Sequence, residues 1–490
     1  MRTALLWKST LAATIAATLG GCTVGPDFAP PASPSATAYR SAQDGQQPVV
    51  AGTPQITQGA GPALRWWTAF GSAELDSLVD RAIAHNASLE ASNATLAAAR
   101  EQLAAARGKQ LPQVDANARV EHEQVNLAAF GLEPNPALGL SGNPEFDLYS
   151  IGGGVSFDLD PFGGQRRQVE QSAAEAQAQL HRTEAAHLSV AGRVVTQVLT
   201  IAALRAQIDT ANALLAEDRR NIDLTSKRKE AGEGTLVEVL NAQSQFENDR
   251  GDIPQLDQQL AEARHMLATL TGISPAELGA TDFDLESLTL PQTIPVAIPS
   301  RLVHKRPDIL QAEADLHAAT AAVGVATARL YPDVTLGGTV SQGALGPEDL
   351  LSGSTRGFDL FAGLTAPIFH GGTLKANKRA AADRARAAAA TYRQTVLDAF
   401  RQVADLLQAV DSDARSVRNQ REAVAVAGRS LHLSRRSYEV GNSGILQTLD
   451  SERQYQSARS NLVRARSRQF LNIARLYVAT AGGWTGAADD

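Results

Sequence analysis

Strict alternation of apolar and polar residues predicts four short β-strands. In residues 114–121, Val, Ala, Ala and Val alternate with Asp, Asn, Arg and Glu, and residues 149–160 continue the pattern. Two later runs, residues 334–341 and 358–366, repeat it. A period of two gives each strand one apolar and one polar face. Each run has about the 9 to 11 residues that a tilted membrane strand needs.

Long helices are predicted between and after these strands. Residues 163–252 contain no proline, and Pro367 is the last proline of the chain. A thin apolar seam, which includes Leu188 and Val198, runs among Ala, Gln, Glu and Arg and indicates helices packed as in a coiled coil. If residues 163–230 form one helix, it is about 100 Å long. We expect this helix to be charged throughout and to lie in water.

The two halves of the chain are copies. Residues 86–120 align without a gap on residues 306–340, and two further matching blocks follow in the same order, which indicates a tandem duplication. Each copy is predicted to run helix, strand, loop, strand, long helix, turn, helix.

Composition and the repeat together divide the chain into six segments. They are a signal peptide at 1–21, a lipidated Pro-rich N-terminal tether outside the core at 22–62, a first repeat at 63–272, a Pro-rich inter-repeat linker at 273–304, a second repeat at 305–482 and a C-terminal tail at 483–490.

The N-terminus has the layout of an export signal. Two basic residues precede an uncharged apolar stretch, residues 9–19, which is too short to span a membrane as an anchor. The following Leu19-Gly20-Gly21-Cys22 resembles a bacterial lipobox, and Cys22 is the only cysteine. We predict that Cys22 is acylated with more than one chain, which gives stable anchoring. Thr23 in place of an aspartate implies sorting to the outer membrane. The alternative is a small buried thiol.

Composition and motifs exclude several functions. The net charge of -7 argues against nucleic acid binding, which needs a basic surface. A mean hydropathy of -0.17 argues against a polytopic helical membrane protein. The His122-Glu123 pair begins a zinc-protease motif, but Asn126 stands where the second histidine belongs. No nucleophile elbow or phosphate loop occurs. We therefore predict no enzyme, no cofactor and no metal.

Four strands are too few to close a membrane barrel. In a bilayer, the backbone N–H and C=O groups along both edges of a spanning sheet must be hydrogen-bonded, which requires a closed barrel. The chain must therefore oligomerise. A dimer gives eight strands and a barrel filled by side chains, whereas a trimer gives twelve and leaves room for water. Together with export, acylation and long helices, a water-filled barrel predicts a conduit that crosses the outer membrane and much of the periplasm.

Five motifs stand out along the chain: Cys22-Thr23-Val24-Gly25-Pro26-Asp27-Phe28, Trp66-Trp67, Pro299-Ser300-Arg301-Leu302, Arg306-Pro307-Asp308-Ile309 and Ala328-Arg329-Leu330-Tyr331-Pro332. Together they resemble the outer membrane factor family, and within it the NodT-type lipoprotein branch of drug-efflux channels related to TolC and OprM. The resemblance implies an α+β membrane protein: a homotrimer whose twelve-stranded outer membrane β-barrel, four strands per chain, continues into a twelve-helix periplasmic α-barrel, with an equatorial domain. It also implies docking on a periplasmic membrane fusion adaptor and an inner-membrane efflux transporter of the RND type, and passive conduction of drugs or other small molecules.

Glycines mark the turns after the long helices. Gly232 and Gly441, with Gly234 and Gly444 just beyond, have the spacing of helix C-caps in αα-hairpins. We expect these turns to form the periplasmic tip that docks the adaptor.

The resemblance also implies a periplasmic gate. Tyr438 matches a gate tyrosine and Asp450 an aspartate ring position. The alignment of the two repeats adds their first-repeat equivalents, with Lys229 matching Tyr438, Asn241 matching Asp450 and Glu238 matching Gln447. Ser443 and Gln447 replace the arginine and second aspartate of the family's gate. A three-fold axis would bring three Asp450 carboxylates together, and such rings favour cations. The alternative for Asp450 is a solvated surface aspartate.

Two other functions remain open at this point. A type I protein-secretion channel shares the architecture and differs in its partners. A non-conducting periplasmic coiled-coil lipoprotein or adaptor shares the seam and the acylated cysteine but needs no membrane strands.

We also expect Trp66 and Trp67 to be ordinary packing residues of the equatorial region. The loops at 123–147 and 342–356 are expected to face the exterior, where long barrel loops lie.

Overall fold

The computed structural model describes residues 23–32, 36–41, 54–59, 61–126, 144–279 and 281–480. The predicted signal peptide, Cys22, most of the predicted loop at 123–147 and the predicted tail at 483–490 lie outside these residues. The chain divides into two compact units. The first comprises Met1–Pro30, Ala97–Gln177 and Ala314–Ala390, and the second comprises Pro31–Leu96, Ala178–Glu313 and Thr391–Asp490. Each unit therefore combines segments of both sequence repeats.

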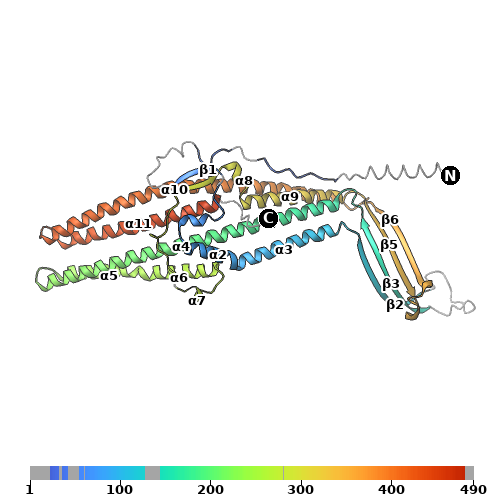
Figure 1. Cartoon of the computed structure of the whole chain (residues 1–490), viewed down its shortest axis with the longest axis horizontal. Coiled ribbons are helices and arrows are strands. Elements are labelled where there is room, and N and C mark those ends of the chain that lie inside the picture. Colours follow the sequence, from blue (N-terminus) through green and yellow to red (C-terminus); the bar gives the residue numbers. More distant parts are fainter. Residues whose placement is uncertain are drawn as a thin grey trace, which may run out of the picture. The chain divides into compact units, whose positions relative to one another are not determined.

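The first unit contains a four-stranded antiparallel sheet (Figure 1). Its strands lie in the order β2 (Gln113–Gln124), β3 (Glu145–Asp158), β5 (Asp333–Ala344) and β6 (Arg356–Thr365). All four predicted strands are thus present, and the two β-hairpins, one from each repeat, meet where β3 pairs with β5. Two short 3-10 helices, Pro347–Asp349 and Gly353–Thr355, lie in the β5–β6 connection.

The sheet has one apolar and one polar face. Across one row, Val114 pairs with Val155, Val155 with Gly338 and Gly338 with Leu360. The next row on the opposite face runs through Asp115, Gly154, Thr339 and Asp359 in the same order. Since side chains alternate across a strand, this register gathers the apolar residues of all four strands on one surface. The apolar face is open to the surroundings of the chain, since Val114 is 77% exposed and Leu360 79%.

Long helices account for most of the rest of the chain. The helices α4 (Gly164–Glu230) and α10 (Thr373–Glu439) have 67 residues each, so the duplication extends to helix length. The others are α2 (Ala73–His85), α3 (Ala87–Gly108), α5 (Leu236–Gly251), α6 (Ile253–Leu270), α7 (Pro275–Leu278), α8 (Pro299–Val303), α9 (Pro307–Ala328) and α11 (Ile445–Thr480). In the first repeat, α4 is followed by two shorter helices, α5 and α6, where the second repeat has the single helix α11. The break lies near Pro254, which stands in the first turn of α6 and cannot continue the hydrogen bonding of α5.

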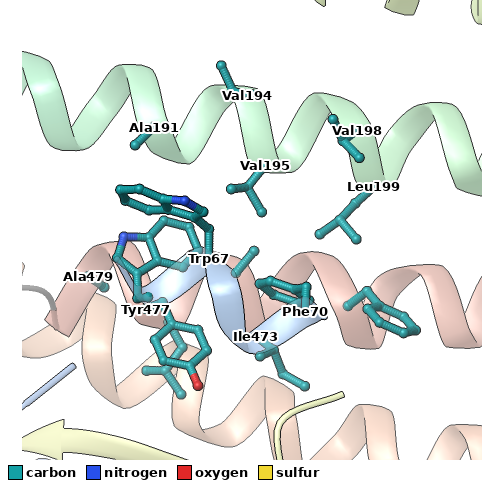
Figure 2. Packing of buried hydrophobic residues seen from close by; sticks show 14 of the residues in the cluster. Trp67, Phe70, Ala191, Val194, Val195, Val198, Leu199, Ile473, Tyr477 and Ala479 are labelled. Carbon is teal, nitrogen blue, oxygen red and sulfur yellow. The ribbon is translucent and has the colours of Figure 1, made fainter. Parts of the chain in front are cut away.

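The second unit has its core around the tryptophan pair (Figure 2). Trp67 and Phe70, in the 3-10 helix η1 (Trp66–Phe70), are fully buried, and Val195 of α4 and Ile473 of α11 pack around them. Trp66 stacks on Tyr477 with ring centroids 5.4 Å apart. The prediction that both tryptophans are packing residues is therefore confirmed.

The middle of α4 differs from the expectation for this helix. An 18-residue window of α4 has a mean hydropathy of 1.4, which by length and composition alone would suit a membrane span. However, 61% of that window is buried inside the protein, where Val194, Val198 and Leu199 pack against the core. The expectation that the helix is charged throughout is therefore wrong for its middle, because this part contributes to the core of the second unit.

The Pro-rich segments are also more than a tether and a linker. Strand β1 (Gln55–Gly59), within the predicted tether, pairs in parallel with β4 (Thr293–Ala297), within the predicted linker. Ile294 and Val296 are completely buried. The extended backbone that proline favours is compatible with a strand in a two-stranded sheet, where Pro295 need not donate to a neighbour. Tyr39 adds to this packing by donating a 2.6 Å hydrogen bond to the carbonyl of Ala297.

Candidate functional site

The turns at the ends of the long helices are fixed by glycines in the left-handed region. Gly232 and Gly441 both have φ of 76°. After α4, the amides of Glu233 and Gly234 donate to the carbonyl of Arg228 at 2.9 and 3.1 Å, which satisfies the end of the helix. A Cβ at Gly232 or Gly441 would meet nothing within 4 Å, so the backbone conformation and not the space selects glycine. The turns therefore have the geometry that the sequence predicted.

A capping box begins the helix after the first turn. The hydroxyl of Thr235 accepts the amide of Glu238 at 3.2 Å, and the carboxylate of Glu238 accepts the amide of Thr235 at 2.8 Å. Glu238, a predicted gate residue, thus has a structural task within its own chain. The Thr-x-x-Glu spacing was the sequence signal for this task.

Arg228 joins the two hairpins at the predicted gate tyrosine. Its guanidinium lies 4.9 Å from the centroid of the Tyr438 ring and donates a hydrogen bond to the tyrosine oxygen. The contact connects α4 with α10 near the end of each helix. A cation-π contact and a hydrogen bond from a charged donor both strengthen the interaction of such a pair. Sequence reasoning did not identify Arg228, because its partner lies 210 residues away.

Asp450 is half exposed and has local partners. Its carboxylate accepts from Arg453 at 2.7 Å and from Gln454 at 2.7 Å, and its side chain is 49% exposed. Asp450 and Asn241, equivalent positions of the two repeats, line one cavity of about 520 Å³ among α4, α5 and α11. The structure therefore brings these two predicted residues together, whereas Tyr438 and Glu238 do not line that cavity.

Buried charges in and beside the lining of this cavity connect the helices. Glu452 is 2% exposed and accepts from Arg435 at 3.0 Å and from Asn221 at 3.3 Å. Arg435 also pairs with Glu217 at 3.0 Å, so α4, α10 and α11 share one network. Burial, together with the neighbouring Asp249 carboxylate, raises the pKa of Asp218 to about 7. Buried pairs of this kind fix the relative position of helices even where they add little net stability.

The N-terminal segment of the first unit is held by a second buried charge. Arg167, with a side chain only 4% exposed, donates to Asp27 and Glu170 at 2.6 Å each and to the carbonyl of Val24 at 3.3 Å. The Phe28 ring stacks on His317 with centroids 4.3 Å apart. These contacts fix the residues that follow Cys22 against the start of α4 and against α9.

An antiparallel sheet with one apolar face, combined with two long helical hairpins, is the architecture of an outer membrane channel. The chain belongs to the outer membrane efflux protein family, whose model matches residues 78–273 and 298–482.

Individual relatives and solved structures agree with this family. The chain is 31% identical over 420 residues to the pyoverdine export outer membrane protein OpmQ of Pseudomonas aeruginosa, covering 86% of this chain and 87% of the relative. It is 28% identical over 434 residues to nodulation protein T of Rhizobium leguminosarum bv. viciae, covering 86% and 84%. The solved structure of the outer-membrane channel OprN matches with a TM-score of 0.83 at 27% identity, and the match covers 94% of this chain and 100% of the chain in that structure.

The comparisons confirm the resemblance read from the sequence, including its NodT-type branch, and place the chain among outer membrane efflux channels. The family and the compared structures are channels rather than enzymes. Within the described part of the chain, no three His, Cys, Asp or Glu side chains are grouped so that they could hold a metal ion.

Proposed function

We propose that the chain is the outer membrane channel subunit of a tripartite efflux system. It passively conducts drugs or other small molecules from an inner-membrane pump, of the RND type, through a periplasmic adaptor to the exterior. The observation that carries this proposal is the sheet of the first unit, with one apolar face, one polar face and only four strands. A spanning sheet of this size is incomplete without further copies.

The sheet edges support a homotrimer. Among the described residues, β2 and β6 each pair with one neighbour only, so each has an unpaired edge. Their exposed apolar residues, such as Val120 at 65% and Phe358 at 79%, suit contact with outer membrane lipid. Three copies give a barrel of twelve strands, which is wide enough for an aqueous channel. The paired helices of three copies would form a twelve-helix periplasmic barrel.

We propose that Cys22 carries the lipid anchor and that the Arg167 contacts position it. Thr23 packs directly on Gly163, since a Cβ at Gly163 would lie 2.7 Å from it. Gly163 directly precedes α4 and follows β3 by a few residues. The acyl chains would therefore start beside the ends of the membrane strands, where they can enter the bilayer without straining the chain.

The two glycine turns and the residues around them form the proposed periplasmic end. The turns are the proposed adaptor-docking surface, because they are exposed loops at the ends of rigid hairpins. The Arg228–Tyr438 contact supports a closed gate, since it ties one hairpin of the chain to the other. The proposed members of this region are Gly232, Gly234, Glu238, Asn241, Tyr438, Gly441, Gly444 and Asp450.

Planar-bilayer recording of the purified protein tests the proposal. We expect discrete ion-conducting steps from a trimer that migrates as such in unheated SDS gels. A protein-secretion channel would conduct as well, but deletion of its gene would impair export of a protein rather than raise sensitivity to small toxic compounds. A non-conducting coiled-coil lipoprotein would give no steps at all, and that result would contradict the proposal.

A further inference from the structure

The cavity among α4, α5 and α11 contains two buried oxygens without partners. Asp218 is 6% exposed and Gln456 is 5% exposed, and both line the cavity. Asp218 Oδ2 and Gln456 Oε1 have no donor. The neighbouring Asp249 carboxylate can share a hydrogen bond with Asp218 only while one of the two is protonated, so it supplies no donor when both are ionised. Buried acceptors nearly always have a donor in folded proteins, so two orphaned oxygens on one cavity indicate that a donor group is missing.

The charge of the lining is negative. Five carboxylates and two guanidiniums line the cavity, namely those of Asp218, Asp249, Asp252, Asp450, Glu452, Arg453 and Arg464. Several carboxylates already have donors: Asp249 accepts from Gln245 at 2.8 Å, Glu452 from Arg435, and Asp450 from Arg453. The buried lining oxygens that still lack a donor are therefore Asp218 Oδ2 and the amide oxygen of Gln456.

The size and apolar part of the lining limit what can supply the donors. The volume of about 520 Å³ lies in the range of small-molecule sites. Leu214, Leu446 and Leu449 provide apolar surface beside the acceptors. A bare metal ion suits this lining poorly, because the described residues form no cluster of three ligating side chains. A cation with N–H donors and an apolar body meets each of these conditions.

We propose that this cavity binds a primary organic ammonium ion, with its N–H groups donating to Asp218 Oδ2 and Gln456 Oε1 and its apolar part against the leucines. The inference rests on the proposed efflux function, because it names a class of molecule that would pass this part of the channel. It differs from cation attraction by a ring of Asp450 carboxylates, since the two donated hydrogen bonds lie within a single chain.

Binding should depend on pH, because only ionised Asp218 attracts the ammonium ion fully. Charged groups face Asp218 from each surrounding helix: Glu217 on α4, Asp249 on α5 and Glu452 on α11, with Arg435 of α10 paired to Glu217 and Glu452. Burial and these carboxylates raise the pKa of Asp218 to about 7. Protonation below that value removes the charge, so affinity should fall as the pH falls.

Calorimetric titration with tryptammonium, at pH 8.5 and 5.5, tests the site on the detergent-solubilised full chain. An alkylammonium stays protonated at both values, since its pKa is about 10. The neutral analogue tryptophol has the same ring and chain without the charge. We expect tryptammonium to bind at least tenfold more tightly than tryptophol at pH 8.5, and to lose about tenfold or more at pH 5.5.

Two variants remove one acceptor each, and a third serves as control. Asp218→Asn and Gln456→Met should each weaken tryptammonium binding about tenfold at pH 8.5, and Asp218→Asn should also remove the pH dependence. Asp223→Asn removes the same charge from α4 at a position 63% exposed, paired with Lys227 and outside the cavity, and should change affinity less than about twofold. Asp218→Asn should fold, because it removes a buried charge that faces other carboxylates. If Asp218→Asn does not fold, the binding measured for Gln456→Met and the pH dependence of binding to the unmodified chain still test the site.

Each outcome separates this inference from the proposed function. Equal affinity for tryptammonium and tryptophol, absence of binding, or unchanged affinity in both cavity variants would overturn it, and ordered water would then satisfy the two oxygens. A sample that conducts ions in planar bilayers but fails this titration contradicts the ammonium site alone. A sample that binds tryptammonium but never conducts contradicts the channel function instead.

Discussion

Arg306 offers the sharpest test of how the second unit is held together. Its guanidinium contacts Asp308 with Nε at 2.9 Å and Nη2 at 2.7 Å, and its Nη1 donates to the carbonyl of Ala479 and to Gln402, each at 3.0 Å. The side chain is 12% exposed. One residue thus joins the start of α9 to α10 and to the end of α11. This geometry gives a physical reason for the Arg-Pro-Asp-Ile motif found in the sequence.

The cost of removing Arg306 follows from these contacts. A hydrogen bond to a charged group contributes about 1.5 to 3 kcal/mol when buried, and much less when exposed. Asp308 is 42% exposed, so its ion pair with Arg306 contributes little to the unfolding free energy. The carbonyl of Ala479 belongs to a residue that is only 2% exposed, so its hydrogen bond to Arg306 contributes more. We therefore expect Arg306→Ala to cost about 3 kcal/mol of unfolding free energy. Arg306→Lys keeps the charge without the planar fork and should cost about 2 kcal/mol.

Urea unfolding of the detergent-solubilised protein, followed by far-UV circular dichroism, measures these costs. Arg401→Ala is the control, because Arg401 is 66% exposed and pairs with Asp398 and Asp405 on the surface of its own helix. It should cost less than about 1 kcal/mol. If Arg306→Ala costs no more than Arg401→Ala, or if lysine replaces Arg306 without loss, the reasoning about the shared guanidinium is refuted.

Three further predictions address the anchor, the gate and the loops. Gly25→Ala should release the N-terminal segment and speed proteolysis near it, because φ is +99° and the new Cβ would lie 2.5 Å from Gly324 Cα; an unchanged digestion rate would count against this. Asp450→Ala should lower cation preference or change single-channel conductance in planar bilayers, and identical recordings would remove Asp450 from the gate. Residues 342–356 should be cleaved by protease added to intact cells; cleavage only after disruption of the outer membrane would show that they do not face outward.

Local patterns made most of the fold predictable. Alternation alone predicted all four strands of the sheet, and glycine after a long helical pattern predicted both turns, because these signals depend on neighbouring residues. The Thr-x-x-Glu spacing of Thr235 and Glu238 is a local signal of the same kind, but Glu238 was predicted only as a gate residue. That spacing assigns Glu238 a task within its own helix, which sequence comparison with the family's gate did not reveal.

Contacts between distant segments were not predictable. The parallel pairing of β1 with β4 joins two Pro-rich stretches that composition alone describes as a tether and a linker. The partner of Tyr438 depends on which faces of α4 and α10 meet, and the apolar seam does not specify those faces to within one residue. The orphaned oxygens of Asp218 and Gln456 depend on three helices at once. Such features require the packed structure.

Disulfide cross-linking of the sheet edges reports whether the barrel closes between copies of the chain. A cysteine at Asp115 on β2 would be combined with one at Gly357, Asp359 or Phe361 on β6. The pair Gly154→Cys and Thr339→Cys, which face each other within one chain, serves as the control for oxidation. We predict that at least one edge pair joins three copies into a covalent ring on denaturing gels. If the control pair cross-links efficiently while every variant with an edge pair stays monomeric in membranes, the barrel does not close between copies.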